Sequence, residues 1–238
     1  MATTKQDWSP TEIGDEPAEM IVDPEHIGIR TMMPILAAIG LIGGYVLGDV
    51  VTGLIDETVG SLCTSIALAL IGLVALTQFG ERVIKPRWSS GRRLFVDRAY
   101  LTMRDKRRKP ATETTMPWQA IKAQAWYFTV PTRKSRVPKG WFCTAVRLVQ
   151  DDDELILYAF LKPEIAQEMP GFERWFTRLR DKKERETLAN TDTRAASQQE
   201  RYRRLEGKRW NDGAELTGED FVAVMELVDQ HATPMGQH

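Results

Sequence analysis

Two long apolar stretches lie side by side near the N-terminus, and charged residues are frequent in the remainder of the chain. The first stretch covers residues 32–55 and the second covers 59–79; the connector between them holds Asp56 and Glu57 but no Lys or Arg. Each stretch has about the 20 residues that an α-helix needs to cross ~30 Å of hydrocarbon. The pattern therefore predicts a transmembrane helical hairpin over residues 31–80.

Small residues recur at a spacing of four along both apolar stretches. Because lipid gives helices no hydrophobic reason to associate, such spacing marks a face where two backbones approach closely. Two interpretations stand: the two helices pack on each other through this face, or the face docks on another membrane subunit. The residues concerned are Gly40, Gly44, Gly48, Ser61, Ser65 and Ala69.

Asp49 is the one acidic residue inside the first apolar stretch. A charge deep in a bilayer is costly and often functional. Asp49 precedes Ile55 by only six residues. It is therefore expected either near the outer headgroups or in a polar contact or proton site within the membrane.

The pattern changes after the hairpin to short segments rich in aromatic and β-branched residues, which is typical of strands. A helical pattern follows, since Phe172, Trp175, Phe176 and Leu179 share one apolar helix face. Residues 92–180 are thus expected to form a small β-sheet or barrel that a helix closes at one end. The expected strands are 93–97, 99–103, 118–121, 125–130, 141–149 and 154–161, with the last two joined by a turn at residues 151–153.

The two terminal segments carry weaker patterns. Residues 1–30 are acidic, polar and contain Pro, which predicts a disordered tail. Residues 181–238 read as a charged arm, either a solvated helix or a flexible segment, followed by a last amphipathic helix from about Thr217. The apolar face of that helix is expected to dock on its own domain or on a partner, through Phe221, Val224 and Val228.

The net charge of −1 averages two unlike halves of the chain. Residues 1–80 contain two basic and ten acidic residues, whereas residues 81–109 alone contain eleven basic residues and three acids. Basic flanks of membrane spans stay on the cytoplasmic side. The charge pattern therefore predicts a two-pass protein with both termini cytoplasmic and only the acidic connector outside.

The basic residues after the hairpin form the strongest polar signal. Juxtamembrane basic residues attract anionic lipid headgroups, at about 1 kcal/mol each near the surface. The alternative is that they only set topology and solubility; nucleic-acid binding is disfavoured because no known reader motif is present. The candidate headgroup contacts are Arg92, Arg93, Lys106, Arg107, Arg108 and Lys109.

Catalytic signatures are missing from the sequence. No phosphate-binding loop, nucleophile elbow, zinc-protease motif or paired Cys-x-x-Cys occurs. The three histidines lie at 26, 231 and 238, and the two cysteines at 63 and 143, so neither set has metal-ligand spacing. We therefore expect no enzymatic activity, no cofactor and no small-molecule substrate.

The order of the expected elements resembles bacterial membrane-anchored pleckstrin-homology-like domains of the YcxB-like kind. The resemblance covers residues 32–180 and includes a Trp118–Ile121 step before the final strand pair, 141–149 and 154–161. It implies a compact barrel capped by a helix, preceded by two transmembrane helices, that acts in binding or regulation at the membrane. It supplies no catalytic residues.

The combined expectation is an α+β membrane protein of the bacterial inner membrane. It would be a non-enzymatic scaffold or accessory subunit of a larger complex, with other membrane-protein subunits and anionic headgroups as partners. Two alternatives stay open. One is a membrane-anchored regulator that senses anionic lipid, and the other is a transporter or secretion-system subunit in which Asp49 takes part in ion or proton movement.

Overall fold

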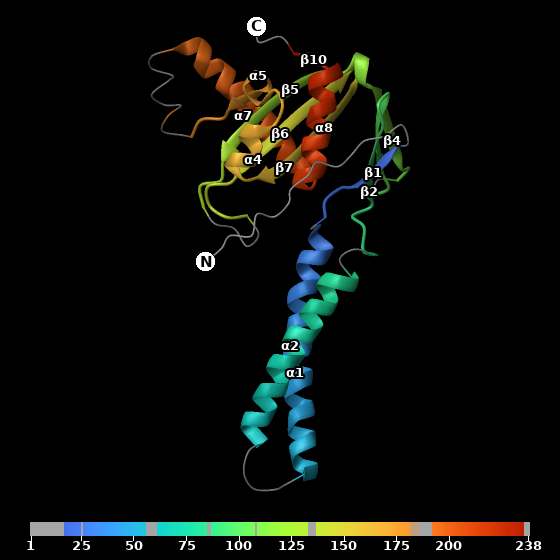
Figure 1. The fold of residues 1–238 in the computed structure, drawn as a ribbon, viewed down its shortest axis with the longest axis vertical. Coiled ribbons are helices and arrows are strands. Elements are labelled where there is room, and N and C mark those ends of the chain that lie inside the picture. The colour runs from blue at the N-terminus through green and yellow to red at the C-terminus, as the bar shows by residue number, and fades with distance from the viewer. Residues whose placement is uncertain are drawn as a thin grey trace. The chain divides into compact units, whose positions relative to one another are not determined.

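The chain forms two compact units, a helical hairpin and a unit with two sheets (Figure 1). In the sequence, the hairpin is inserted between two parts of the sheet unit. The hairpin unit comprises residues 24–90, and the sheet unit comprises residues 1–23 together with 91–238. The structure is a computed structural model that describes residues 17–24, 26–55, 61–84, 87–107, 109–132, 137–181, 184 and 192–235.

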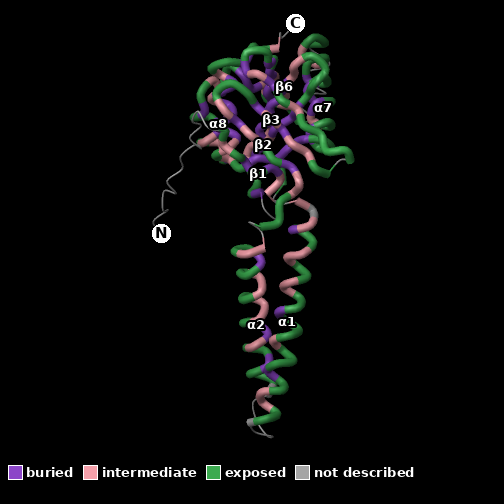
Figure 2. Tube along the Cα trace, turned by 90° about the vertical axis from the view of Figure 1, so that its right-hand side faces the viewer, coloured by how far each residue is buried: buried purple, intermediate pink, exposed green. Residues whose placement is uncertain are grey.

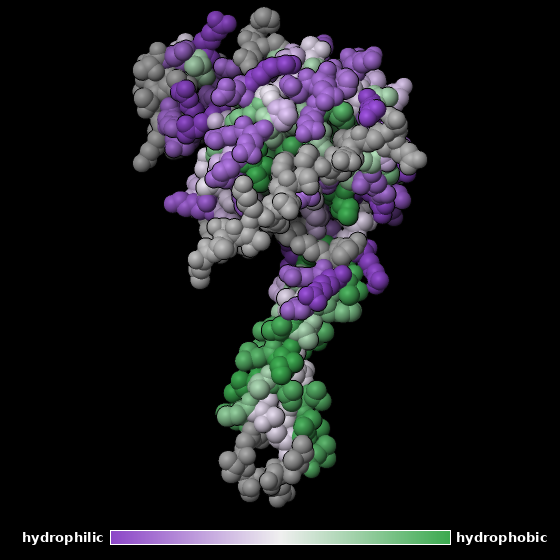
Figure 3. All heavy atoms as spheres, viewed as in Figure 1, coloured by the Kyte–Doolittle hydropathy of each residue, from purple (hydrophilic) through white to green (hydrophobic). Residues whose placement is uncertain are grey.

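The hairpin unit consists of two long helices, α1 (Ile27–Ile55) and α2 (Ser61–Phe79), and α2 continues into a π-helical turn, η1 (Gly80–Ile84). Both helices are long and apolar enough to cross a membrane, over Gly28–Leu54 and Leu62–Ile84. Only 11% of each span is buried within the chain, unlike the core helix of a water-soluble domain. On the face that Figure 3 shows, hydrophobic residues cover most of the hairpin, and hydrophilic residues gather at the end near residues 26–30 and 81–90, outside this apolar part. The two helices are therefore candidate spans of a two-pass membrane protein.

The first sheet of the sheet unit contains four antiparallel strands in the order β1-β2-β3-β4. Strand β1 (Ala18–Ile21) precedes the hairpin, and β2 (Arg92–Val96), β3 (Tyr100–Asp105) and β4 (Thr112–Pro117) follow it. Residue 18 pairs with residue 96 and residue 21 with residue 93. The two chain segments that lead into and out of the hairpin are thus neighbouring strands of one sheet. The expectation of a disordered tail over residues 1–30 is wrong for Ala18–Ile21; residues 1–16 lie outside the described part of the chain.

The second sheet is built on a three-strand meander, β5 (Lys122–Thr129), β6 (Phe142–Gln150) and β7 (Asp153–Leu161). Gln150 pairs with Asp153, so the acidic run forms the expected tight turn, with Asp151 at a φ of 50°. Three short parallel strands extend the sheet. The strands β8 (Phe176–Arg178) and β10 (Thr233–Pro234) pair with β5, and β9 (Ala214–Glu215) pairs with β7.

Four described helices accompany the sheets: α4 (Pro163–Glu168), α5 (Phe172–Trp175), α7 (Thr193–Asp212) and α8 (Gly218–His231). The single helical face expected around Phe172–Leu179 is divided, because α5 ends at Trp175 and Phe176 opens β8. Gly171 precedes α5 at a φ of 69°, a backbone conformation that glycine adopts without steric cost. The expected strand 118–121 is instead a 3₁₀ turn, η2 (Trp118–Ala120), between β4 and β5.

One hydrophobic core joins both sheets and α8 (Figure 2). It includes Met20 of β1, Leu94 of β2 and Leu157 of β7, and all three are at most 1% exposed. A smaller cluster joins α7 to the sheet through Tyr202, Leu205 and Trp126. The N-terminal strand and the C-terminal segment therefore belong to the same folded unit as the central strands, and the domain extends beyond the expected 92–180.

The α+β class is confirmed, and the sheets do not close into a barrel. The first sheet ends at β1 and β4, and the second ends at β9 on one side and at β8 and β10 on the other. In place of a helix that caps one end of a barrel, α8 contributes seven buried residues to the core that both sheets share.

Candidate functional site

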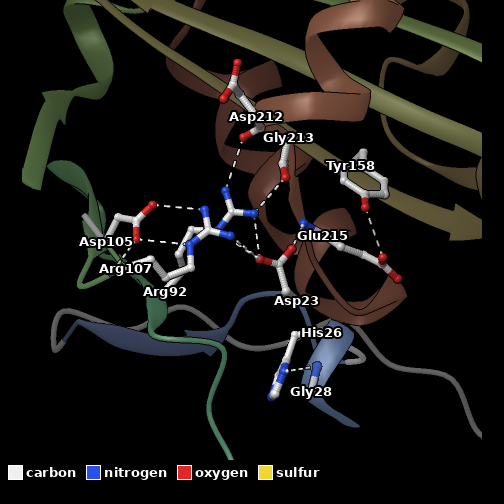
Figure 4. Close-up of polar contacts among 10 residues, drawn as sticks. All are labelled: Asp23, His26, Gly28, Arg92, Asp105, Arg107, Tyr158, Asp212, Gly213 and Glu215. Atoms are coloured by element: carbon white, nitrogen blue, oxygen red, sulfur yellow. Dashed lines mark hydrogen bonds and ion pairs between the residues drawn. The ribbon is translucent and has the colours of Figure 1, made fainter. Parts of the chain in front are cut away.

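The most connected polar site of the sheet unit begins with an ion pair between Asp23 and Arg92 (Figure 4). Asp23 follows β1, and Arg92 is the first residue of β2. The Arg92 Nη2 and Nε atoms donate to Asp23 Oδ2 at 2.6 and 2.8 Å. Their side chains are 8% and 16% exposed. A buried pair of this kind locks the two strand ends together, because separating it leaves a charge without solvent or partner.

The same pair holds the end of helix α7. Arg92 donates to the carbonyl oxygens of Asp212 and Gly213 at 3.2 and 2.8 Å, and Asp23 Oδ1 accepts from the amide of Glu215 at 3.0 Å. The Asp23 amide donates to the Glu215 carbonyl at 2.7 Å. A guanidinium suits this place, since the last carbonyls of a helix carry partial negative charge. Three segments far apart in the sequence therefore meet at one point, which we call the clasp (Asp23, Arg92 and residues 212–215).

Asp105, the last residue of β3, and Arg107, in the loop that follows it, border the clasp (Figure 4). The Arg107 Nη2 atom lies 3.0 Å from Asp105 Oδ2, and its Nη1 atom lies 3.9 Å from Asp23 Oδ2. Burial on its own would raise the pKa of Asp105. Hydrogen bonds from the Arg107 side chain and amide, with the charges of Arg107 and Arg92, outweigh burial and hold that pKa below its usual value. The same hydrogen bond raises the pKa of Arg107, so both groups stay charged.

A second polar cluster lies between α7 and the meander sheet. Arg209 is 4% exposed, donates to Glu206 at 2.6 and 2.8 Å and stacks over the Tyr158 ring at 4.4 Å. Tyr158 donates to Glu215 at 3.1 Å, which links this cluster to the clasp. Burial, followed by the charge of Glu215, raises the pKa of Tyr158. Burial would lower the pKa of Arg209, but its bond to Glu206 raises it. With both pKa values raised, Tyr158 stays neutral and Arg209 stays charged near neutral pH. The two side chains connect α7 to the meander sheet.

Within the hairpin unit, His26 connects the start of α1 to the segment after α2. The Gly28 amide donates to His26 Nδ1 at 3.2 Å, and His26 Nε2 lies 3.0 Å from the Trp88 carbonyl oxygen. The ring of His26 also meets the Trp88 ring edge to face at 5.6 Å. These contacts fix the orientation of the His26 ring between the start of α1 and Trp88.

The glycine face of α1 lies against α2. A Cβ added at Gly40 would clash with the Gly72 carbonyl, one at Gly44 with the Leu68 carbonyl, and one at Gly48 with the Ser65 Cα atom. Ser65 and Ala69 are 1% and 5% exposed, and the side chain of Ser61 lies outside the described part. This face is therefore occupied within the hairpin, and a further subunit would have to contact a different face.

Some of the candidate headgroup residues form ion pairs within the chain, and others are exposed. Arg92 is buried in the clasp, Arg93 pairs with Glu19, and Arg107 pairs with Asp105. Arg92 is thus not placed to meet a headgroup. Lys106 and Lys109 are exposed, and Arg108 lies outside the described residues.

The expected docking residues of the last helix serve its own domain. Phe221, Val224 and Val228 are all 0% exposed within the main core. They are therefore not available to a separate partner while the domain is folded. The predicted start of this helix is confirmed, because Thr217 Oγ1 accepts from the Asp220 amide at 3.2 Å.

The clasp was not predicted from the sequence. Its members come from segments that no motif or helical spacing relates, and the only available signal was that Asp23 and Arg92 flank the two apolar stretches. Among the described residues, no group of three or more His, Cys, Asp or Glu side chains is placed to hold a metal ion.

Comparisons of this chain with protein-family models, with curated proteins and with solved structures find no match. The resemblance to pleckstrin-homology-like domains stays a prediction.

Proposed function

We propose that this chain is a non-enzymatic, two-pass subunit of a larger membrane complex, in which the sheet unit is held to both ends of the membrane hairpin. The observation that carries the proposal is the pairing of β1 with β2 together with the Asp23–Arg92 ion pair. A simple membrane anchor needs one flexible connection. In this chain both connections lead into neighbouring strands of one folded sheet, so the chain joins the domain to the membrane part at two points instead of one.

The same pairing supports the topology given by the charge pattern. Two strands of one sheet must lie on one side of a membrane, so the segment before the hairpin and the segment after it share a compartment. The basic flank over residues 81–109 favours the cytoplasmic side of a bacterial inner membrane. Under this proposal both termini are cytoplasmic and the connector around residues 56–60 is outside.

The polar chemistry of the sheet unit also favours a structural role. Arg92, Arg209 and Glu215 are each at most 7% exposed. Their partners include backbone carbonyls, carboxylates and a phenol of the same chain. Charged groups fixed in this way stabilise one arrangement of strands and helices.

A lipid-sensing regulator is the second candidate. Lys106 and Lys109 favour it, because both are exposed on the loop that follows β3. It is the weaker candidate because Arg92, Arg93 and Arg107 have carboxylate partners within the chain.

Extraction of the native protein in a mild detergent tests the proposal. Native size analysis and mass spectrometry of the extract should find a defined assembly that contains this chain and other membrane proteins at fixed ratios. A lone monomer or a homodimer would contradict it. Salt-sensitive binding of that lone species to anionic vesicles, reduced by Lys106→Glu with Lys109→Glu, would then favour the lipid-sensing regulator.

A further inference from the structure

One flank of helix α1 carries polar side chains at helical spacing on the lipid-facing surface. Tyr45, Asp49 and Thr52 follow one another at intervals of four and three residues, so they lie on one face of the helix. Tyr45 is 44% exposed and Asp49 is exposed. The Thr52 hydroxyl donates to the Gly48 carbonyl at 2.8 Å and is satisfied locally. Within the described residues, the Asp49 carboxylate has no hydrogen-bond or ion-pair partner.

An apolar groove adjoins this stripe between the two helices. Its volume is about 340 Å³, which is sufficient for large side chains of another helix. Tyr45 belongs to both features, so Asp49 lies one helical turn beyond the groove on the same flank. The groove is lined by Leu41, Ile42 and Tyr45 of α1 and by Ile66, Ala69 and Leu70 of α2.

Asp49 lies within the candidate span Gly28–Leu54, five residues before its end. Its neighbour Gly48 packs against Ser65 of α2. A carboxylate that faces hydrocarbon has no donor, and such residues in natural spans almost always meet a polar or charged partner. The opposite flank of α1 offers only apolar side chains, such as Leu47 at 57% and Leu54 at 81% exposure.

The negative charge of Asp49 favours a different protein, rather than a second copy of this chain, as the partner. A symmetric copy that used the same flank would bring the two Asp49 carboxylates to the same depth, where like charges repel. The glycine face cannot serve in its place, because α2 already covers it. The required partner is a helix that brings a positive charge to the level of Asp49.

We infer that the flank formed by Tyr45, Asp49 and the adjoining groove binds a transmembrane helix of a different protein. That helix carries Lys, Arg or His at the depth of Asp49 and a bulky apolar side chain that fills the groove. The inference rests on the proposed function as a complex subunit and specifies the face and the partner chemistry.

Site-specific photocrosslinking of the full chain in its native membrane tests this inference. A benzoylphenylalanine is placed at Tyr45 in one variant and at Leu47 in the control. The two positions are two residues apart, about 200° around the helix, and both are exposed. We expect an adduct from position 45 to a membrane-spanning peptide with a basic residue at the depth of Asp49, and no such adduct from position 47.

Charge variants then test the role of Asp49. Asp49→Lys should lower the yield of the adduct by about tenfold or more, and reversal of the partner's basic residue to Glu should restore it. Asp49→Asn, which is easier to insert in a bilayer, should also lower the yield, whereas Asp49→Glu should keep it.

Three results would overturn the inference. These are equal adduct yields from both positions, an adduct with a second copy alone, or an adduct yield that is the same for wild type and for the charge variants at residue 49. If the native complex forms but no adduct arises at position 45, this inference fails and the proposed function stands. If the chain is extracted without other proteins, the proposed function itself is contradicted.

Discussion

The Asp23 carboxylate and the Arg92 guanidinium approach to 2.6 Å, although 69 positions separate the two residues along the chain. The whole membrane hairpin lies between them in sequence. Their contact places the start and the end of the hairpin insertion at one point of the sheet unit, beside the end of α7. The contact therefore closes the sheet unit at the place in the chain where the hairpin is inserted.

Loss of the Arg92 side chain should destabilise the sheet unit strongly. Arg92→Ala removes the guanidinium that donates to Asp23 Oδ2 and to the carbonyls of residues 212 and 213, and breaking a buried pair costs about 3–5 kcal/mol. Arg93→Ala removes an exposed pair with Glu19 and should cost no more than about 1 kcal/mol. Urea unfolding of the detergent-solubilised full chain, followed by the fluorescence of its tryptophans, measures both. Equal losses in the two variants would show that the clasp does not stabilise the fold.

The stability of the sheet unit should fall on acidification partly through Asp105. Its pKa is lower in the folded chain than the usual 3.8, because bonds from Arg107 outweigh burial. A group of this kind stabilises the folded state above its unfolded pKa, and the contribution is lost as the pH falls through the folded value. Between about pH 5 and pH 2, the unfolding free energy of the wild type should therefore fall more steeply than that of Asp105→Asn. Asp152→Asn, at the exposed β6–β7 turn, is the control and should follow the wild type. Parallel curves for wild type and Asp105→Asn would contradict this reading.

The hairpin should tolerate a side chain at Gly43 but not at Gly44. A Cβ at Gly44 meets the Leu68 carbonyl, whereas nothing lies within 4 Å of a Cβ at Gly43. Gly44→Val should destabilise the packed helix pair by about 1–3 kcal/mol, in the range of overpacking. Gly43→Val should change it by less than about 0.5 kcal/mol. Distance measurements between spin labels at the hairpin ends, during titration with a denaturing detergent, compare the two. A similar effect of both substitutions would mean that the helices do not pack through the glycine face.

The last helix should be necessary for the folded domain. Phe221 is 0% exposed in the core that joins both sheets, so Phe221→Ala should cost about 3–5 kcal/mol. Trp210→Ala is the control, because Trp210 is 72% exposed and its loss should cost less than about 1 kcal/mol. Thermal unfolding of the two variants gives the comparison. A stable Phe221→Ala protein with impaired complex formation would instead return this helix to the role of a partner-docking element.

The elements that could be predicted from the sequence are those with a long periodic pattern. The two apolar stretches predicted the helices. Segments rich in aromatic and β-branched residues predicted part of β5 and the β6–β7 hairpin with its acidic turn. Strand β1 could not be found, because Ala18–Ile21 is short and contains Glu19, and its pairing depends on β2 far along the chain. Strand β4 was missed because Thr112–Pro117 is polar and follows a basic loop. The burial of the last helix on nearly all sides was missed for a similar reason. Its apolar stripe was visible in the sequence, but the shared core in which the helix is buried was not.

Site residues were predicted well only where one helix determines the geometry. The glycine spacing depends on α1 alone, so the sequence identified the packing face. The basic residues after the hairpin depend on tertiary partners. Arg92 reads as a juxtamembrane cation in the sequence, and only the fold reveals that Asp23 neutralises it.

Membrane topology is the most direct test of the central claim that both ends of the hairpin lie in one sheet on the cytoplasmic side. Single cysteines at Glu19 on β1, Lys106 after β3 and Glu57 in the connector would be introduced into a Cys63→Ala chain, in which the remaining Cys143 is buried. An impermeant maleimide is then applied to intact cells and to permeabilised cells. The account predicts that positions 19 and 106 react only after permeabilisation and that position 57 reacts in intact cells. Reaction of positions 19 and 106 from opposite sides of the membrane would contradict it.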